Sequence, residues 1–219
     1  GETVILATVA AQPLVEDVGY FPLSCEYVEK HYAGGRISSS RFIKRETKPT
    51  DEAILTGRLI DRSIRPLFPK DFRGSEVQVI LTVLSIDQSN DPDIVGLIGA
   101  SAALSISSVP WNGPIACIRV GERDGNLIIN PPMDEMEHLN MDLLVSFNKE
   151  KVVMIETQAN QISEDLLFEA IKEAHKNAQP VIELIEEFAK EAGKKKQVFS
   201  HLAEEVEEAL LSEVSKIIK

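Results

Sequence analysis

The stretch TDEAILTGRLIDRSIRP, residues 50–66, carries the clearest helical pattern in the chain. Thr50 is a helix-capping residue type, two acids follow it in the first turn, and Pro66 ends the pattern because its ring cannot continue a helix. The small or apolar side chains that share one face at helical spacing are Ala53, Gly57, Ile60 and Ile64. We therefore expect an amphipathic helix that buries this face against the rest of the protein.

Runs rich in Val, Ile and Leu lie on both sides of this helix and are typical of β-strands. We expect strands at residues 4–10, 77–86, 115–120, 127–129, 141–147 and 152–157. Asp124-Gly125 predicts a hairpin turn between the third and fourth of these strands. One further helix is expected from Asp91-Pro92-Asp93, and another from Ser163 to about Gly193, kinked or divided by Pro180.

This alternation predicts an α/β (α+β) fold with a mixed sheet packed with helices. The expected first domain covers residues 1–193. A linker and the start of a helical unit are expected over residues 194–219, where Gly193 and three lysines separate two helical patterns.

Positive charge is concentrated in one segment of an otherwise acidic chain. The whole sequence has a formal net charge of −12. Between Arg36 and Arg73, ten Lys or Arg residues outnumber five Asp or Glu residues, so this segment carries +5 and the remainder −17. Such a concentration attracts phosphates, and we therefore look for binding function in this segment.

Three arginines of the helical stretch share one side of the helix. At 100° per residue, Arg58, Arg62 and Arg65 lie within about 60° of one another, opposite the apolar face. Neighbouring guanidinium groups repel one another unless an anion joins them, and arginine is suited to bidentate phosphate contacts. We expect the three to face one cleft or channel and to contact phosphate or an RNA backbone. The alternative is that they form ion pairs within or between subunits, with Asp61 as one nearby acid.

A loop rich in Gly and Ser precedes the helix and adds an aromatic ring to the charge. Its tip places Phe42 beside Lys44, Arg45 and Lys48. An aromatic ring among cations is the combination that binds single-stranded nucleic acid, although Phe42 could instead be a hydrophobic anchor. We expect residues 38–48 to be mobile without RNA, because small side chains and like charges give them little to pack against.

No established catalytic or metal-binding motif is present in the sequence. It lacks a Walker A motif, a dinucleotide-binding fingerprint and an HExxH motif, and its four histidines show no metal-ligand spacing. Helix capping accounts for Asp91 and Asp93, and a place in the core accounts for Asp142. Cys25 and Cys117 are expected to be free thiols, which fits an intracellular compartment. No apolar run approaches the roughly 18–20 residues of a membrane span. We predict no catalytic residue, no metal ligand and no membrane association for this chain.

Several segments resemble the polynucleotide phosphorylase family. They occur in the family's order along the chain: RLIDRSIRPLFP at 58–69, NDPDI at 90–94, GASAALS at 99–105, PWNGP at 110–114, Asn130-Pro131 and EAGK at 191–194. The resemblance covers essentially the whole chain. It implies a polyribonucleotide nucleotidyltransferase, which degrades RNA from the 3′ end with inorganic phosphate and releases nucleoside diphosphates.

The architecture of that family implies further expectations. Its members have two RNase PH-like cores, of the ribosomal protein S5 domain 2-like fold, joined by a helical domain and followed by KH and OB-fold modules. Three chains form a ring with a central channel, so a homotrimer is implied. This chain resembles the first core, without its opening strands, and the beginning of the helical domain. The family's catalytic carboxylates, Mg²⁺ and main phosphate site belong to the second core and so would lie outside this chain. A cytoplasmic location and partners in RNA degradation are also implied.

The resemblance also implies site residues. The family's channel loop, usually two Phe followed by two Arg, corresponds to Phe42-Ile43-Lys44-Arg45, and Lys48 stands where the family often has Arg. The helix arginines match intact, and the family implies contacts for them at the edge of the active site. The RNA-binding residues expected on these grounds are Phe42, Lys44, Arg45, Lys48, Arg58, Arg62 and Arg65.

The leading interpretation is the RNA-guiding, noncatalytic half of a phosphorolytic 3′-to-5′ exoribonuclease. One alternative is a noncatalytic, ring-forming RNase PH-like scaffold subunit. Another is a metabolic enzyme whose arginines bind a small phosphorylated substrate. For the isolated chain we expect weak RNA binding and no phosphorolysis.

Overall fold

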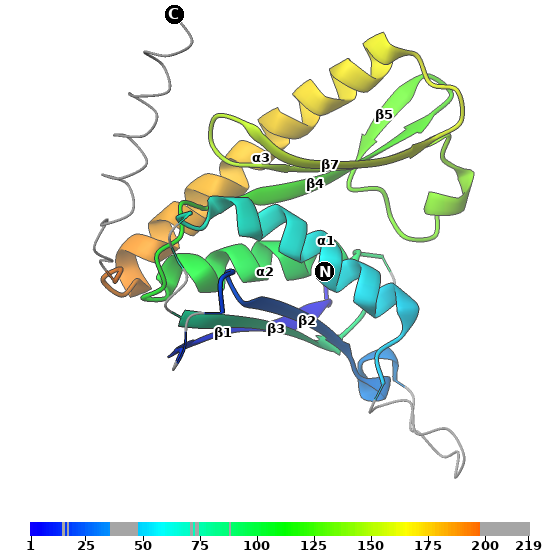
Figure 1. Ribbon diagram of the computed structural model, residues 1–219. Coiled ribbons are helices and arrows are strands. Elements are labelled where there is room, and N and C mark those ends of the chain that lie inside the picture. The colour runs from blue at the N-terminus through cyan, green and yellow to red at the C-terminus, as the bar shows by residue number, and fades with distance from the viewer. Residues whose placement is uncertain are drawn as a thin grey trace, which may run out of the picture.

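Two sheets alternate with two helical layers in this protein (Figure 1). The computed structural model describes residues 1–14, 16, 18–35, 48–70, 72, 75–87 and 89–197. The first sheet is mixed and has the strand order β1-β3-β2, because β1 runs antiparallel and β2 parallel to the central strand. Its strands are β1 (Val4–Pro13), β2 (Leu23–Glu29) and β3 (Ser75–Ser85).

The second sheet is antiparallel throughout and has the order β5-β4-β6-β7. Its strands are β4 (Ala116–Arg123), β5 (Asn126–Ile129), β6 (Met141–Phe147) and β7 (Val152–Ala159). Asp124 and Gly125 join β4 to β5 with φ angles of 52° and 82°, the left-handed conformation of a tight hairpin turn. The predicted hairpin is therefore confirmed.

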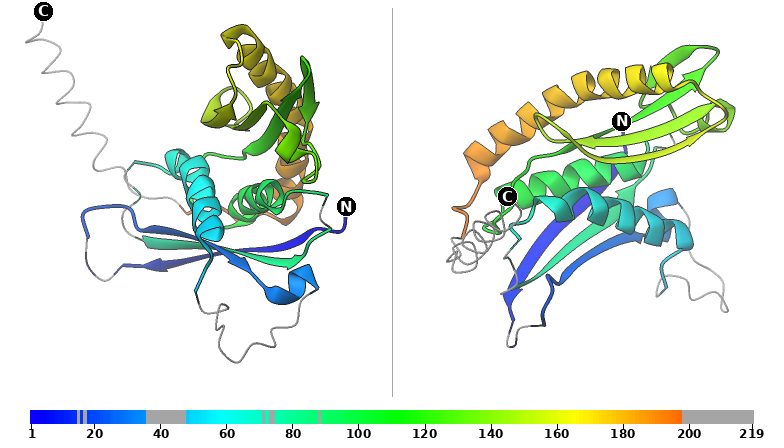
Figure 2. Two further views of the ribbon diagram at one scale, coloured as in Figure 1. Left: turned by 90° about the vertical axis from the view of Figure 1, so that its right-hand side faces the viewer. Right: turned by 45° about the horizontal axis from the view of Figure 1, so that its top comes forward.

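Two helices, α1 (Asp51–Ile64) and α2 (Pro92–Ile106), lie between the sheets, and α3 (Glu164–Ala192) covers the far face of the second sheet (Figure 2). Each of the three helices begins where a side chain accepts a hydrogen bond from a first-turn backbone N–H: Thr50, Asp91 and Ser163. Pro180 lies inside α3 without dividing it. None of the described helices is long and apolar enough to cross a membrane.

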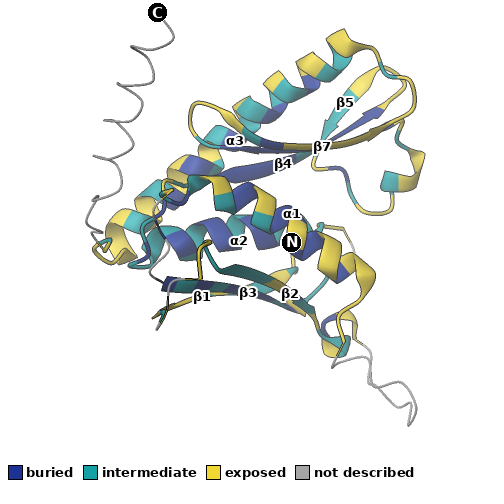
Figure 3. Cartoon of the chain, viewed as in Figure 1, coloured by how far each residue is buried: buried dark blue, intermediate teal, exposed yellow. Residues whose placement is uncertain are grey.

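Successive side chains along the central strands of the second sheet, β4 and β6, point to opposite faces and so belong to two separate cores. Cys117 and Leu144 point toward α1 and α2, whereas Ile118 and Leu143 point toward the alanine stripe of α3. Figure 3 shows the buried residues on the surfaces where the layers meet. The apolar face predicted for residues 50–66 is buried at all four positions, with Ile60 and Ile64 fully inaccessible.

The structure confirms the predicted α/β (α+β) class with a mixed sheet and all six predicted strands. It adds β2, which the sequence did not predict as a strand. Both cysteines are free thiols, as predicted. Residues 198–219, where the second helical unit is expected, lie outside the described part of the chain.

Candidate nucleic-acid interface

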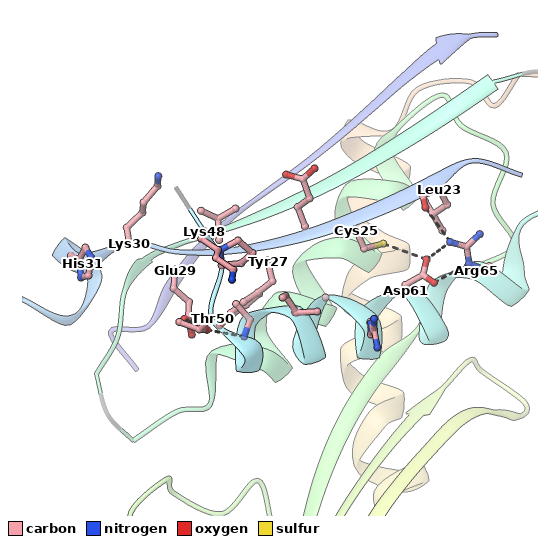
Figure 4. A pocket seen from close by; sticks show the side chains of 17 residues that line it. Leu23, Cys25, Tyr27, Glu29, Lys30, His31, Lys48, Thr50, Asp61 and Arg65 are labelled. Atoms are coloured by element: carbon pink, nitrogen blue, oxygen red, sulfur yellow. Dashed lines mark hydrogen bonds and ion pairs between the residues drawn. The ribbon is translucent and has the colours of Figure 1, made fainter. Parts of the chain in front are cut away.

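A groove of about 850 Å³ runs between strand β2 and helix α1 (Figure 4). Its apolar floor includes Leu23, Cys25 and Ala53, and its rim carries five basic side chains. The basic residues that line it are Lys30, His31, Lys48, Arg58 and Arg65. Figure 4 shows Lys30, His31 and Lys48 at one end of the groove and Arg65 with Asp61 at the other.

The walls of the groove are α1 and the free edge of β2, which lie close to each other. Pro22 accepts a hydrogen bond from the central strand β3, so the odd-numbered residues of β2 direct their backbone groups away from β3, toward α1. A Cβ atom on Gly57 would lie 3.1 Å from the Cys25 carbonyl oxygen. Glycine at this position therefore lets the helix backbone lie against the strand edge. Burial raises the pKa of the Cys25 thiol to about 12, and the charge of Asp61 adds to this, so the thiol stays protonated.

Arg65 is hydrogen-bonded to the free edge of β2. Its guanidinium donates two hydrogen bonds to Asp61, of 2.9 Å from Nε and 2.7 Å from Nη2. The same group donates to the carbonyl oxygens of Phe21 at 3.3 Å and Leu23 at 3.1 Å. No neighbouring strand covers these two carbonyls, so Arg65, which Asp61 holds in place, satisfies them at the beginning of the free edge of β2.

The other charged side chains of the groove, acids and bases alike, are free of ion pairs within the described residues. The Glu29 carboxylate accepts a hydrogen bond from Thr50, and the Glu26 carboxylate accepts one from Gln78. Within the described part of the chain, Lys30, Lys48 and Arg58 form no ion pair. The four Lys and Arg side chains that line the groove outnumber its three acids, and three of these cations have no ion-pair partner among the described residues, so they are available to an anionic ligand.

The prediction that three helix arginines face one cleft is wrong for Arg62. Around the helix axis Arg65 is displaced about 20° from Arg58 toward β2, and Arg62 about 40° toward the second sheet. Arg62 does not line the groove, and its guanidinium forms an ion pair with Glu156 of β7. The two arginines on the strand side, Arg58 and Arg65, do share the groove.

A second cavity, of about 440 Å³, lies on that other side of α1, under β7. It is lined by Leu55, Thr56, Leu59, Asp93, Arg119, Asp142, Leu144, Glu156, Thr157 and Gln158. Arg119 forms ion pairs with Asp91 and with Asp142, the latter at 3.2 Å from its Nε. Asp91 also accepts the capping hydrogen bond of α2 from the backbone of Asp93, as the sequence predicted.

Burial raises the pKa of two acids in this cavity, Asp93 and Asp142. For Asp93, the hydroxyl groups of Thr56 and Tyr27 oppose the effect of burial. For Asp142, the charge of Arg119 opposes it and that of Glu156 adds to it. Among the residues that the structure describes, no group of three or more His, Cys, Asp or Glu side chains is arranged to hold a metal ion.

The structure thus brings together some of the expected site residues. Lys48, Arg58 and Arg65 line one groove, whereas Arg62 lies apart from it. Phe42, Lys44 and Arg45 fall in residues 36–47, outside the described part of the chain, as does nearly all of the segment expected to be mobile. Sequence reasoning missed Lys30 and His31 on the rim, because no sequence pattern connects them with the helix.

Residues 1–110 match the model of the 3′ exoribonuclease family, domain 1, and residues 113–177 match domain 2 of the same family. The polyribonucleotide nucleotidyltransferase of Thermus thermophilus is 47% identical over 212 residues, which cover 95% of this chain and 30% of that protein. The protein of the same name from Alkaliphilus oremlandii is 50% identical over 198 residues, which cover 90% of this chain and 28% of that protein.

Rice Rrp46 has a similar fold, with a TM-score of 0.64 over 87% of this chain and 85% of that structure, at 17% identity. This likeness shows an RNase PH-like fold and nothing more. The chain spans about 30% of the length of the curated relatives described above.

Proposed function

The chain belongs to the 3′ exoribonuclease family, and from this premise we propose that it is the RNA-guiding, noncatalytic first core of a polyribonucleotide nucleotidyltransferase. The whole protein would degrade RNA from the 3′ end with inorganic phosphate. Relatives that bear this name match nearly all of the present chain. The groove between β2 and α1 would hold part of the RNA backbone.

The unpaired cations of the groove carry this proposal. Lys30, Lys48 and Arg58 line one concave surface and have no ion-pair partner within the described residues. Lys48 on the groove rim directly follows residues 36–47 in the sequence, which include Arg36, Arg41, Lys44 and Arg45. Cations that track a groove suit the backbone of a single-stranded nucleic acid.

The second cavity supports a noncatalytic role. Phosphate attack on a phosphodiester develops negative charge, which catalytic sites of this chemistry usually stabilise with a metal held by carboxylates. Here Asp91 and Asp142 are paired with Arg119, and Asp93 is a buried acid whose pKa is raised. A carboxylate that already pairs with an internal arginine is a poorer metal ligand than a free one.

The remaining parts of the proposal follow from the family. Residues 1–193 would form the first core and residues 194–219 a linker and the start of a helical domain. Inorganic phosphate would be the co-substrate, and Mg²⁺ would bind in a second core. The complete protein would act as a homotrimer in the cytoplasm, with RNA and RNA-degradation proteins as partners.

The first test is RNA binding as a function of salt. Fluorescence anisotropy with labelled oligoadenylate should give weak binding that decreases as salt rises. A plot of log K against the logarithm of the salt concentration should fall with a slope of about −0.7 for each phosphate contacted. Substituting Lys30, Lys48 and Arg58 by Ala should reduce the slope by about 2, because three contacts are lost. The control variant removes the same charge from α3 and the end of β4, at Lys172, Lys176 and Arg123, and should bind like the unaltered chain. Equal loss of binding in both variants would contradict the groove as the RNA site.

The second test concerns activity. The isolated chain, incubated with oligoadenylate, phosphate and Mg²⁺, should release no ADP. ADP release that survives further purification would show a catalytic site in this chain, and Asp91, Asp93 and Asp142 would be the first residues to substitute. Absence of any salt-dependent RNA binding, together with ring formation, would favour the scaffold alternative.

A further inference from the structure

Arg62 is held by an acid from a different layer of the fold. Its guanidinium pairs with the carboxylate of Glu156, which lies on β7, the strand that passes over α1 in Figure 1. Both side chains remain about half exposed, with relative accessibilities of 54% for Arg62 and 53% for Glu156. The pair is therefore within reach of a ligand in solvent.

An exposed pair of this kind is held weakly. Solvent screens the attraction, and ordering two long side chains costs conformational entropy. Glu156 lines the same cavity as Asp142, and its charge raises the pKa of that carboxyl, so the two acids repel each other. A phosphate group that approaches α1 can replace the Glu156 carboxylate as the partner of Arg62.

The position of Arg62 on the helix makes such an exchange productive. Arg62 follows Arg58 by one turn and is rotated from it by about 40°. Arg58 lines the groove and has no ion-pair partner in the described residues. Rotation of the Arg62 side chain away from β7 would bring its guanidinium toward the side of α1 where Arg58 lies.

We propose that Glu156 is a positioning residue that sets the RNA affinity of this core by holding Arg62 out of the RNA path until a backbone phosphate displaces the carboxylate. This inference rests on the proposed function, since it assigns a control element to the same RNA site. Glu156 itself does not touch RNA. It acts only through Arg62.

The test compares oligoadenylate binding by single and double variants. E156Q keeps the size of the side chain and releases Arg62, and it should bind labelled oligoadenylate roughly two- to fivefold more tightly at about 50 mM salt, with the gain fading as salt rises. E169Q makes the same change of net charge at an exposed position of α3 and should bind like the unaltered chain. In R62A/E156Q the gain should disappear, because Arg62 is the only route by which Glu156 acts.

A spectroscopic readout separates positioning from general electrostatics. The Nε–Hε NMR signal of Arg62 should shift on E156Q substitution in the absence of RNA, and oligoadenylate should shift it in the unaltered chain. E156Q binding equal to that of E169Q would overturn the inference, as would a gain that persists in R62A/E156Q.

The outcomes also separate this inference from the proposed function. Normal salt-dependent binding by the unaltered chain, with no effect of E156Q, would overturn the role of Glu156 alone. Absence of RNA binding by the unaltered chain at low salt would overturn both.

Discussion

Replacement of Arg65 by Ala should cost folding stability, whereas replacement of Arg58 by Ala should cost RNA binding. Both residues lie on one side of α1 and line the same groove. Arg65 donates to Asp61 and to two carbonyl oxygens of the β2 edge, while Arg58 has no ion-pair partner in the described residues. The two variants therefore separate a structural arginine from a ligand-binding one.

The magnitude follows from the contacts of Arg65. Its side chain is 41% exposed and that of Asp61 26% exposed, so their ion pair is worth about 0.5–1 kcal/mol after solvent screening. The hydrogen bonds to Phe21 and Leu23 add roughly 0.5–1 kcal/mol each, less than is usual for a charged donor because the group is partly solvated. R65A should lower the free energy of unfolding by about 2 kcal/mol, and Tm by roughly 4–8 °C for a domain of this size.

Urea unfolding followed by circular dichroism measures this difference. R65K keeps the charge but not the planar fork, so it should recover about half of the loss. R58A is the matched control and should change stability by less than about 0.5 kcal/mol, as is usual for an exposed position. Equal stability of R65A and R58A would refute the assignment of Arg65 to the strand edge.

Three further predictions concern other contacts of the fold. G57A should lower the free energy of unfolding by about 1 kcal/mol in urea, because the added Cβ would press on the Cys25 carbonyl. This loss is expected despite the better helix propensity of Ala. A gain in stability would show that α1 can move away from β2. The raised pKa of Asp93 means that the folded chain binds more protons than the unfolded chain. The free energy of unfolding should therefore fall as the pH rises from the pKa of an ordinary carboxyl group through the raised pKa of Asp93. D93N should flatten this fall in unfolding measured across pH and be the more stable form at pH 7, and an unchanged pH profile would contradict the argument. Lys196 donates hydrogen bonds of 2.7 and 3.0 Å to carbonyls at the end of α2, so K196M should cost about 1 kcal/mol and speed amide hydrogen exchange at Lys194; unchanged exchange would count against it.

Much of the fold could be predicted from the sequence because its periodicities are strong. The four buried positions of α1 follow helical spacing, and the strands of the second sheet are near-continuous apolar runs. Strand β2 was not predicted because only Leu23, Cys25 and Tyr27 face the core, and polar residues separate them in the sequence. An edge strand of seven residues with two glutamates lacks the apolar density on which strand prediction depends.

The sequence predicted which residues belong to the candidate site better than it predicted which partners they contact. Charge counting located the basic segment, and a helical wheel placed three arginines on one side of α1. Which of them faces a ligand depends on partners that lie far away in sequence: Glu156 is 94 residues from Arg62, and the carbonyls bound by Arg65 are 42 and 44 residues from it. Spacing within one helix carries no information about such partners.

The junction between the two family segments has a consequence for how the molecule folds. Matches to the family models end at residue 110 and resume at residue 113, and Trp111 lies between them, with its buried indole donating a hydrogen bond to the Ile64 carbonyl at the end of α1. The helices α1 and α2 lie between the two sheets, and Cys117 and Leu144 of the second sheet share a core with the strands of the first. Each segment buries part of its apolar surface in this shared core, so evolutionary modules and cooperative folding units do not coincide in this chain. The two segments should unfold together in a single transition, and an exchange of one segment between relatives would have to preserve the shared helical layer.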